Sequence, residues 1–250
     1  MITNNMVKYF QSLKHQKYRL KYKQFLIEGK RIITEAVKND FMFHIVLYTE
    51  KFKIKNPGFI ENLISKGHYI ECLSKKKINK IALTKTPSGI IAICNLPEQS
   101  QFNFISNNWL YLDQISNPGN LGTLFRTAAW FRIKNIALSP KSLDPYNPKV
   151  IRAGMGAHFY LSIHQGININ IFKEHNYYTI GADHRGESLN RDFEIPNRWV
   201  LVLGGESHGL SKTVDNKLDI MLSIPKNGFG DSLNVSIAGS ILLYELYKNQ

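Results

Sequence analysis

The chain has 250 residues, 43% of them hydrophobic, only two cysteines and a formal net charge of +13. This composition fits one or two globular domains, and it argues against a disulfide framework or a membrane span, which needs about 20 consecutive apolar residues. The first ten residues contain no apolar signal core. We therefore expect a cytoplasmic protein in which Cys72 and Cys94 are reduced.

Positive charge is concentrated in the first part of the chain. Residues 1–98 carry 18 Lys and Arg against 7 Asp and Glu, a net charge of +11, whereas residues 99–250 carry 14 against 12, a net charge of +2. A lysine-rich genome would raise the charge of both parts alike. The asymmetry therefore favours a polyanion-binding module, most simply one for nucleic acid, joined to a nearly neutral domain.

Apolar strand-like runs alternate with helical ones in the first part. The pattern predicts strands at 24–29, 43–49, 68–73 and 89–94, and helices at 30–39, 57–67 and 74–82. A polar segment with a proline, residues 96–108, is the clearest boundary. We predict a basic first domain over 1–98, a linker over 99–106 and a second domain over 107–250.

The alternation resumes after this boundary. It predicts strands at 109–113, 133–139, 177–182, 199–205 and 219–225, and helices at 120–131, 147–156 and 235–247. The strand at 199–205 is almost wholly apolar, which is typical of a buried parallel sheet. Both parts are therefore predicted to be α/β.

Polar and glycine-rich clusters follow three predicted strands, where open α/β sheets bind ligands. The first cluster, 113–131, contains Gly119, Asn120 and Gly122, and its otherwise apolar helix carries Arg126. The arginine either extends to the surface or meets an anion near the start of the helix. The second cluster, 201–211, places glycines around Glu206, and it matches neither a Walker A loop nor GxGxxG.

The third cluster opens the last helix with Asp231, Ser232 and Asn234. An N-cap uses only one of these groups, so another can face a ligand. The sequence leaves open which of Ser232 and Asn234 does the capping. Neither HxH nor HExxH spacing nor a cysteine cluster is present, so we expect no metal site, and the absence of GxSxG argues against a hydrolase.

Taken together, the three clusters resemble motifs 1, 2 and 3 of the SpoU (TrmH) family of RNA ribose 2′-O-methyltransferases, in the SPOUT superfamily. The matching segments are NPGNLGTLFRTA, LVLGGESHGLS and IPKNGFGDSLNVSIAGSILLYE. Upstream, KYRLKYKQFLIEGKRIITEAV and TKTPSGIIAIC resemble the amino-terminal substrate-binding domain of many members. The resemblance covers nearly the whole chain.

This resemblance implies an α/β fold with a small N-terminal RNA-binding domain and a C-terminal SPOUT domain, whose parallel sheet ends in a deep trefoil knot that binds S-adenosylmethionine. Glycines in the binding loops would allow close backbone approach. The implied cofactor-binding residues are Leu203, Gly204, Gly205, Ile224 and Leu233.

The resemblance also implies the catalytic set. Arg126 matches the motif 1 arginine, either as a base or, because free Arg is protonated at neutral pH, as an electrostatic stabiliser. Asn120 matches the asparagine that helps to place it, and Glu206 the glutamate that orients the site. Ser232 and Asn234 match the motif 3 pair.

Further expectations concern partners. Family members usually form homodimers through the C-terminal domain. The candidate phosphate contacts are Lys14, Lys17, Arg19, Lys21 and Lys23, among which Tyr18 and Tyr22 could stack on bases or simply pack. The extra domain favours ribosomal RNA over tRNA. The alternatives are a tRNA methyltransferase, a non-catalytic RNA-binding assembly factor, and, less favoured, a dinucleotide-dependent oxidoreductase.

The chain departs from the family pattern at three positions. Arg132 stands where a glycine is usual, Gly205 replaces a frequent Asn or Ser, and Asp231 replaces a common Glu. A residue other than glycine in a left-handed turn costs about 1 kcal/mol, so we expect the turn at Arg132 to differ. None of the three touches the matched catalytic positions.

Overall fold

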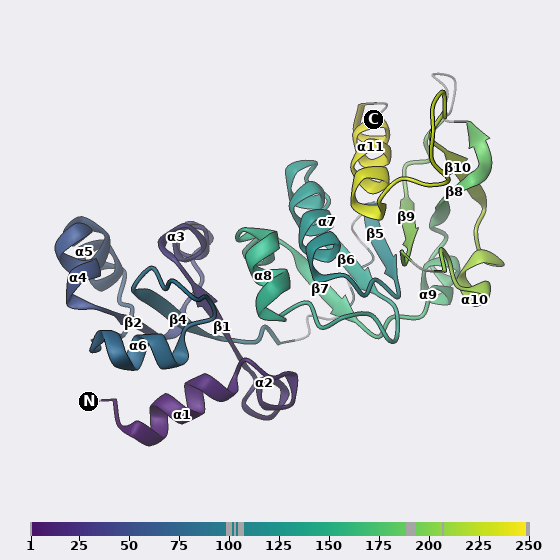
Figure 1. Cartoon of the computed structure of the whole chain (residues 1–250). Helices are drawn as coiled ribbons and strands as arrows, with labels where there is room; N and C mark the ends of the chain where they lie inside the picture. The colour runs from purple at the N-terminus through teal and green to yellow at the C-terminus, as the bar shows by residue number, and fades with distance from the viewer. Residues whose placement is uncertain are drawn as a thin grey trace. The chain divides into compact units, whose positions relative to one another are not determined.

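The computed structural model describes residues 2–98, 102, 104, 108–188, 194–206 and 208–248, so most of the predicted linker lies outside the described residues. By their contacts the residues form two compact units (Figure 1). Unit 1 comprises Met1–Glu98 and Tyr146–Phe159, and unit 2 comprises Gln99–Pro145 and Tyr160–Gln250. Residues 146–159, predicted as part of the second domain, belong by their contacts to unit 1, where Tyr146 and Ile151 join the core.

Unit 1 is built on a mixed four-stranded sheet in the order β1-β4-β2-β3. Its strands are β1 (Gln24–Glu28), β2 (Phe43–Tyr48), β3 (Ile70–Cys72) and β4 (Ile90–Asn95). Strand β4 runs antiparallel to β1 and β2, and β3 runs parallel to β2. Because side chains alternate along a strand, Phe25 and Ile27 enter one core and Leu26 enters another on the opposite face.

Helices cover both faces of this sheet. One core takes side chains from α3 (Lys30–Lys38), α4 (Glu50–Lys55), α5 (Pro57–Ser65) and α8 (Pro148–Gly154), and η1 (Ala157–Phe159) packs beside it. The other core takes them from α1 (Asn4–Ser12) and α6 (Lys75–Ile81). Unit 1 is therefore a three-layer α/β fold, as predicted for this part of the chain. The remaining helix, α2 (Gln16–Tyr22), connects α1 to the first strand.

The prediction that Arg19 contacts RNA phosphate is wrong. Its side chain is only 2% exposed, and Nη1 donates hydrogen bonds to the carbonyl oxygens of Leu13 and Lys14, each at 2.9 Å. The guanidinium therefore ties α2 to the end of α1. By contrast, Lys17, Lys21 and Lys23 are exposed.

Lys14, the remaining candidate of the basic group, is half-buried. Its Nζ donates to the carbonyl oxygen of Lys80 at 3.2 Å, and burial lowers its pKa. Only part of this ammonium group is therefore open to a polyanion.

Replacing Arg19 with alanine is expected to destabilise unit 1 by about 2–3 kcal/mol. The substitution removes a buried charged donor and leaves the carbonyl groups of Leu13 and Lys14 without it. All three tryptophans, at 109, 130 and 199, lie in unit 2, so urea unfolding followed by tryptophan fluorescence reports on that unit while far-UV circular dichroism reports on both. The circular dichroism transition should shift and the fluorescence transition should not. The exposed neighbour Lys17→Ala is the control, and an equal effect of both variants would contradict the assigned role of Arg19.

Unit 2 contains a six-stranded sheet in the order β10-β8-β9-β5-β6-β7. All its paired strands are parallel, which confirms the predicted parallel sheet. The strands are β5 (Asn108–Asp113), β6 (Asn135–Leu138), β7 (Ser162–Gln165), β8 (Tyr178–Ser188), β9 (Trp199–Gly204) and β10 (Ile220–Ser223).

Helices cover the two faces of this sheet as well. Val200 and Val202 of β9 share a core with α9 (Asn170–Glu174) and α10 (Lys212–Asp215). On the opposite face α7 (Pro118–Trp130) and α11 (Val235–Lys248) lie side by side (Figure 1). Gly239 of α11 is required there, because a Cβ would lie 2.6 Å from both Leu124 and Leu203. No helix in the described part of the chain is long and apolar enough to cross a membrane.

Helix α7 has a defined cap at each end. Asn117 Oδ1 accepts hydrogen bonds from the N–H groups of Gly119 and Asn120, at 2.8 and 3.2 Å, and Pro118 occupies the first helical position. At the other end Arg132 adopts φ +60°, and the N–H of Ile133 donates to the Ala128 carbonyl at 2.9 Å. The arginine thus takes the left-handed conformation that a glycine would adopt more readily, and the expectation that this turn would differ is wrong.

Candidate active site

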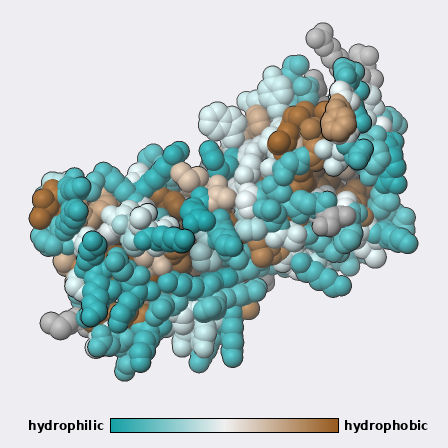
Figure 2. Space-filling view, in the orientation of Figure 1, coloured by the Kyte–Doolittle hydropathy of each residue, from teal (hydrophilic) through white to brown (hydrophobic). Residues whose placement is uncertain are grey.

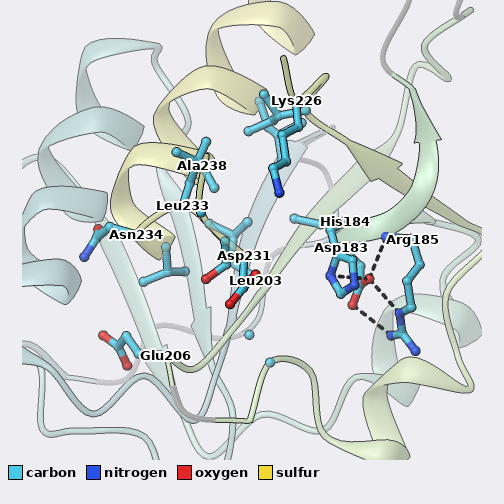
Figure 3. A pocket seen from close by; sticks show the side chains of 18 of the residues that line it. Asp183, His184, Arg185, Leu203, Glu206, Lys226, Asp231, Leu233, Asn234 and Ala238 are labelled. Atoms are coloured by element: carbon cyan, nitrogen blue, oxygen red, sulfur yellow. Dashed lines mark hydrogen bonds and ion pairs between the residues drawn. The ribbon is translucent and has the colours of Figure 1, made fainter. Parts of the chain in front are cut away.

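A cavity of about 890 Å³ lies at the carboxyl ends of β8, β9 and β10 (Figure 3). Its walls come from the residues that follow these strands and from the start of α11. All five predicted cofactor-binding residues line it: Leu203, Gly204, Gly205, Ile224 and Leu233. Strand ends in a parallel sheet meet at one edge, which explains why segments so distant in sequence share one cavity.

The loop after β9 folds closely back on itself. A Cβ on Gly204 would lie 2.2 Å from the carbonyl carbon of Gly209, which itself has φ +62°. The N–H of Gly209 donates to the Gly205 carbonyl at 3.0 Å. The buried carboxylate of Asp113 secures the far end of the loop by accepting the N–H of Ser211 at 2.7 Å. Gly204 is therefore required chiefly because the backbone of Gly209 in the same loop passes so close to it.

Asn234 caps α11, which answers the question left open by the sequence. Its side-chain Oδ1 accepts the N–H of Ser236 at 2.9 Å, and its carbonyl accepts the N–H of Ala238 at 2.9 Å. Ser232 lies earlier in the loop, is exposed, and lines the cavity.

Three predicted catalytic residues form one hydrogen-bonded group. Asn120 Nδ2 donates to Glu206 Oε1 at 2.6 Å, and Asn234 Nδ2 donates to Asn120 Oδ1 at 3.1 Å. In Figure 3, Glu206 and Asn234 lie on the same side of the cavity. The helix α7, the loop after β9 and the start of α11 thus contribute one side chain each.

Arg126 does not join this group. It is exposed on α7, does not line the cavity, and makes no hydrogen bond or ion pair with the residues that the structure describes. At 3.6 residues per turn it points about 120° away from Asn120 around the helix axis. Its guanidinium is therefore available to a group of an incoming substrate.

The sequence reasoning missed the wall opposite Glu206, which β8 supplies (Figure 3). Gly181 of β8 pairs with Met221 and Glu187 with Leu222, so residues 182–186 bulge out of the ladder. Gly186 permits this path, because a Cβ there would lie 2.5 Å from the Met221 carbonyl oxygen. The bulge carries Asp183 to the cavity.

Asp183 and Arg185 form a bidentate ion pair on this wall, with contacts of 2.7 Å (Nε–Oδ1) and 2.8 Å (Nη2–Oδ2). The backbone N–H of Arg185 also donates to Oδ1, at 2.9 Å. Chiefly through these side-chain hydrogen bonds, Arg185 lowers the pKa of Asp183 to about 2. A sequence signal for this wall did exist, because the polar residues Asp183 and Arg185 come directly after the strand predicted at 177–182.

The fold and the cavity define an α/β enzyme with its ligand site at the carboxyl edge of a parallel sheet. Comparison with known proteins makes this specific. The model of the SpoU rRNA Methylase family matches residues 107–244, and that of the MRM3-like substrate binding domain matches residues 4–92. The chain belongs to the SpoU rRNA methylase family, and it is an S-adenosylmethionine-dependent RNA methyltransferase. The fold of this family implies the predicted trefoil knot.

Curated relatives are similar over nearly the whole chain. The 23S rRNA (guanosine(2553)-2′-O)-methyltransferase RlmP of Bacillus subtilis is 28% identical over 97% of this chain and 96% of its own length. The mitochondrial rRNA methyltransferase 3 of Xenopus laevis is 26% identical over 93% of this chain and 71% of its own.

Solved structures are similar over both units as well. A putative RNA methyltransferase of the TrmH family from Porphyromonas gingivalis has a TM-score of 0.88 at 29% identity, with complete coverage of both chains. An AdoMet-bound rRNA methyltransferase from Sinorhizobium meliloti shares the fold, with a TM-score of 0.82 at 24% identity over 99% of this chain and 96% of that one.

The residues present fit S-adenosylmethionine. The cavity volume lies within the range of roughly 300–1,000 Å³ typical of ligand sites. Lys226 lines the cavity, as does Arg185, which pairs with Asp183. However, Glu206 and Asp231 also line it, and carboxylates suit a ligand that carries a sulfonium and an ammonium group. Backbone at Gly228 and Gly230 is open, since a Cβ at either would meet nothing within 4 Å.

Proposed function

We propose that this protein methylates a ribose 2′-hydroxyl of ribosomal RNA. The observation that carries the proposal is the Glu206–Asn120–Asn234 group beside a cavity that fits the methyl donor. The activity for which the B. subtilis relative is named, a 2′-O-methylation of 23S rRNA, supports both the reacting atom and the class of RNA. A cytoplasmic location belongs to the same proposal, because the B. subtilis relative is named for a bacterial rRNA and bacterial ribosomes are cytoplasmic.

The cofactor supplies a methyl group on a positively charged sulfur. Leu203, Gly204, Gly205, Ile224 and Leu233 would hold it, mainly through backbone groups and apolar contact. A ribose hydroxyl is a poor nucleophile at neutral pH, so the protein must align it and assist the loss of its proton.

The polar residues divide these tasks. Glu206 and Ser232, which line the cavity, would orient the hydroxyl, and Asn120 and Asn234 would hold Glu206 in position. Arg126 would bind the phosphate beside the target ribose and stabilise the oxygen as negative charge develops on it. We favour this role over that of a base because arginine side chains act in proteins as hydrogen-bond donors and not as acceptors.

Unit 1 would grip the RNA. Its visible face is largely hydrophilic (Figure 2), and α2 carries exposed lysines at 17 and 21, with Lys23 directly after it. Tyr18 and Tyr22 stack on each other with ring centroids 6.2 Å apart, and Lys21 lies over the Tyr22 ring. This combination of cations with one exposed and one partly exposed tyrosine suits phosphate contact and base stacking together.

Replacing Lys17, Lys21 and Lys23 together with alanine is expected to weaken RNA binding and to flatten its salt dependence. Each lost phosphate contact removes roughly 0.7–0.9 from the slope of log K against log salt. The matched control replaces Lys51, Lys53 and Lys55, three exposed lysines of α4 in the same unit, with the same loss of charge. If the two triple variants gave equal slopes of log K against log salt, the proposal that Lys17, Lys21 and Lys23 contact the RNA would be wrong.

We also propose that the protein forms a homodimer through unit 2. Large apolar side chains remain exposed on α7 and α11, with Trp130 83% exposed and Ile237, Tyr244 and Tyr247 about half exposed. Figure 2 shows apolar atoms gathered over α11. A second copy would bury this surface. Analytical sedimentation measures the molecular mass in solution, which should correspond to a dimer for the wild type and to a monomer for Trp130→Glu.

The direct test of the proposed function is the mapping of ribose methylation in a strain that lacks this gene. One ribosomal 2′-O-methyl group should disappear and return with the wild-type gene. Loss of a tRNA methyl group would select the tRNA alternative. Loss of none, together with no measurable S-adenosylmethionine binding, would favour an RNA-binding factor with a vestigial site.

A further inference from the structure

The hydrogen bonds of the Glu206–Asn120–Asn234 group have a single consistent direction. The backbone N–H of Ser236 can only donate, and it donates to Asn234 Oδ1 at 2.9 Å. The Ser236 hydroxyl donates to the same oxygen at 2.7 Å and also lies 3.5 Å from Asn120 Oδ1. These two donors settle which end of the Asn234 amide faces α11.

The orientation is passed on from one side chain to the next. Because Oδ1 of Asn234 faces Ser236, its NH₂ group faces Asn120 Oδ1, at 3.1 Å. The NH₂ group of Asn120 then faces Glu206 Oε1, at 2.6 Å. Flipping either amide would oppose two acceptors or two donors, so only this arrangement satisfies every group.

We propose that Ser236 is a positioning residue for methyl transfer, which acts through Asn234 and Asn120 to orient Glu206. The proposal rests on the function proposed above. Ser236 is only 7% exposed, whereas Asn234 is exposed and its amide would otherwise exchange partners with water. A second donor on Asn234 Oδ1 opposes that exchange.

The orientation matters because of what it leaves open. Glu206 makes one hydrogen bond with the residues that the structure describes, and that bond engages Oε1. The other carboxylate oxygen remains available at the cavity, where it can accept a hydrogen bond from the ribose hydroxyl. Ser236 thus helps to aim the free oxygen without touching the substrate.

Ser236→Ala is the first test, with Ser240→Ala as its matched control. Ser240, one turn further along α11, donates to the Ser236 carbonyl at 2.7 Å and lies 3.0 Å from Thr127 Oγ1 on α7. Each variant removes one hydroxyl from the same helix. We expect kcat to fall about tenfold in Ser236→Ala, as the loss of one hydrogen bond allows, while KM for both substrates stays within twofold. Ser240→Ala should keep its kcat, and Ser236→Thr should restore most of the lost rate.

A spectroscopic readout tests the relay without turnover. In ¹⁵N-labelled protein without substrate, the side-chain NH₂ groups of Asn120 and Asn234 should exchange with solvent faster in Ser236→Ala than in wild type. Ser240→Ala should leave both rates unchanged. Equal exchange in wild type and Ser236→Ala would overturn the proposal, whatever the activity.

A double-mutant cycle separates positioning from general packing. Asn120→Ala interrupts the relay, so adding Ser236→Ala to it should cost no further rate in a single-turnover assay with excess enzyme. A second tenfold loss there, or an equal loss in Ser240→Ala, would show that Ser236 acts only through helix packing. A wild-type enzyme without methyl transfer would instead refute the proposed function, and the exchange measurement would still judge the relay.

Discussion

Arg126→Ala is expected to lower the rate of methyl transfer on the order of a thousandfold and to leave S-adenosylmethionine affinity within twofold. The large loss follows from removing a cation that would stabilise the reacting oxygen, a contribution typically worth factors of about 10²–10³. The unchanged affinity follows from geometry, since Arg126 does not line the cavity. Single-turnover methyl transfer and calorimetric titration of the cofactor measure the two quantities.

Arg132 provides the control for this experiment. It is a second exposed arginine, just beyond the end of the same helix, and it occupies a left-handed turn that glycine adopts without strain. Arg132→Gly should retain activity and gain up to about 1 kcal/mol in stability. Normal turnover in Arg126→Ala would contradict the catalytic role of Arg126. A comparable loss of rate in Arg132→Gly would show that the loss in Arg126→Ala comes from the change in net charge.

Gly204→Ala is expected to weaken S-adenosylmethionine binding more than a hundredfold. The added Cβ would lie 2.2 Å from backbone of Gly209, so the loop after β9 must move away from its present path. That loop contributes Gly204, Gly205 and Glu206 to the cavity, so its displacement would disrupt several contacts at once. Calorimetric titration of the cofactor measures the change directly.

A comparison with Gly228→Ala distinguishes this explanation from a general intolerance of alanine in the loops that line the cavity. At Gly228 an added Cβ meets nothing within 4 Å, and φ there is not positive. The unfolding midpoint should therefore fall in Gly204→Ala and stay unchanged in Gly228→Ala. Unimpaired cofactor binding in a stably folded Gly204→Ala protein would contradict the close backbone approach described here.

Strong apolar periodicity made most of the fold predictable. The largely buried strands β1, β2, β4, β5 and β9 were all expected, because their buried faces require runs of apolar residues. The elements that were missed are short or strongly polar, such as α2, β7, α9 and α10. β7 lies at the edge of its sheet and carries only one buried side chain, so it left little apolar signal.

Local sequence could not separate Arg19 from its neighbours. Arg19, Lys17 and Lys21 are closely spaced cations on one short helix, and only one of them faces the end of α1. The side of α2 that is buried depends on where α1 ends in space. Burial is a tertiary property, and a charged residue enters the interior only where partners such as the Leu13 and Lys14 carbonyls await it.

The sequence by itself determined three of the segments that form the site, because glycines, asparagines and a glutamate at the ends of apolar strands leave few other arrangements for a parallel sheet, whereas the β8 wall was missed. Only the tertiary structure decided how their side chains divide the work. Asn120 and Glu206 are 86 positions apart, and Asn120 and Asn234 are 114 apart, yet each pair shares a hydrogen bond. Whether Asn234 or Ser232 caps α11, and whether Arg126 joins the group, depends on helix rotation and loop path, which arise from packing and not from the local pattern.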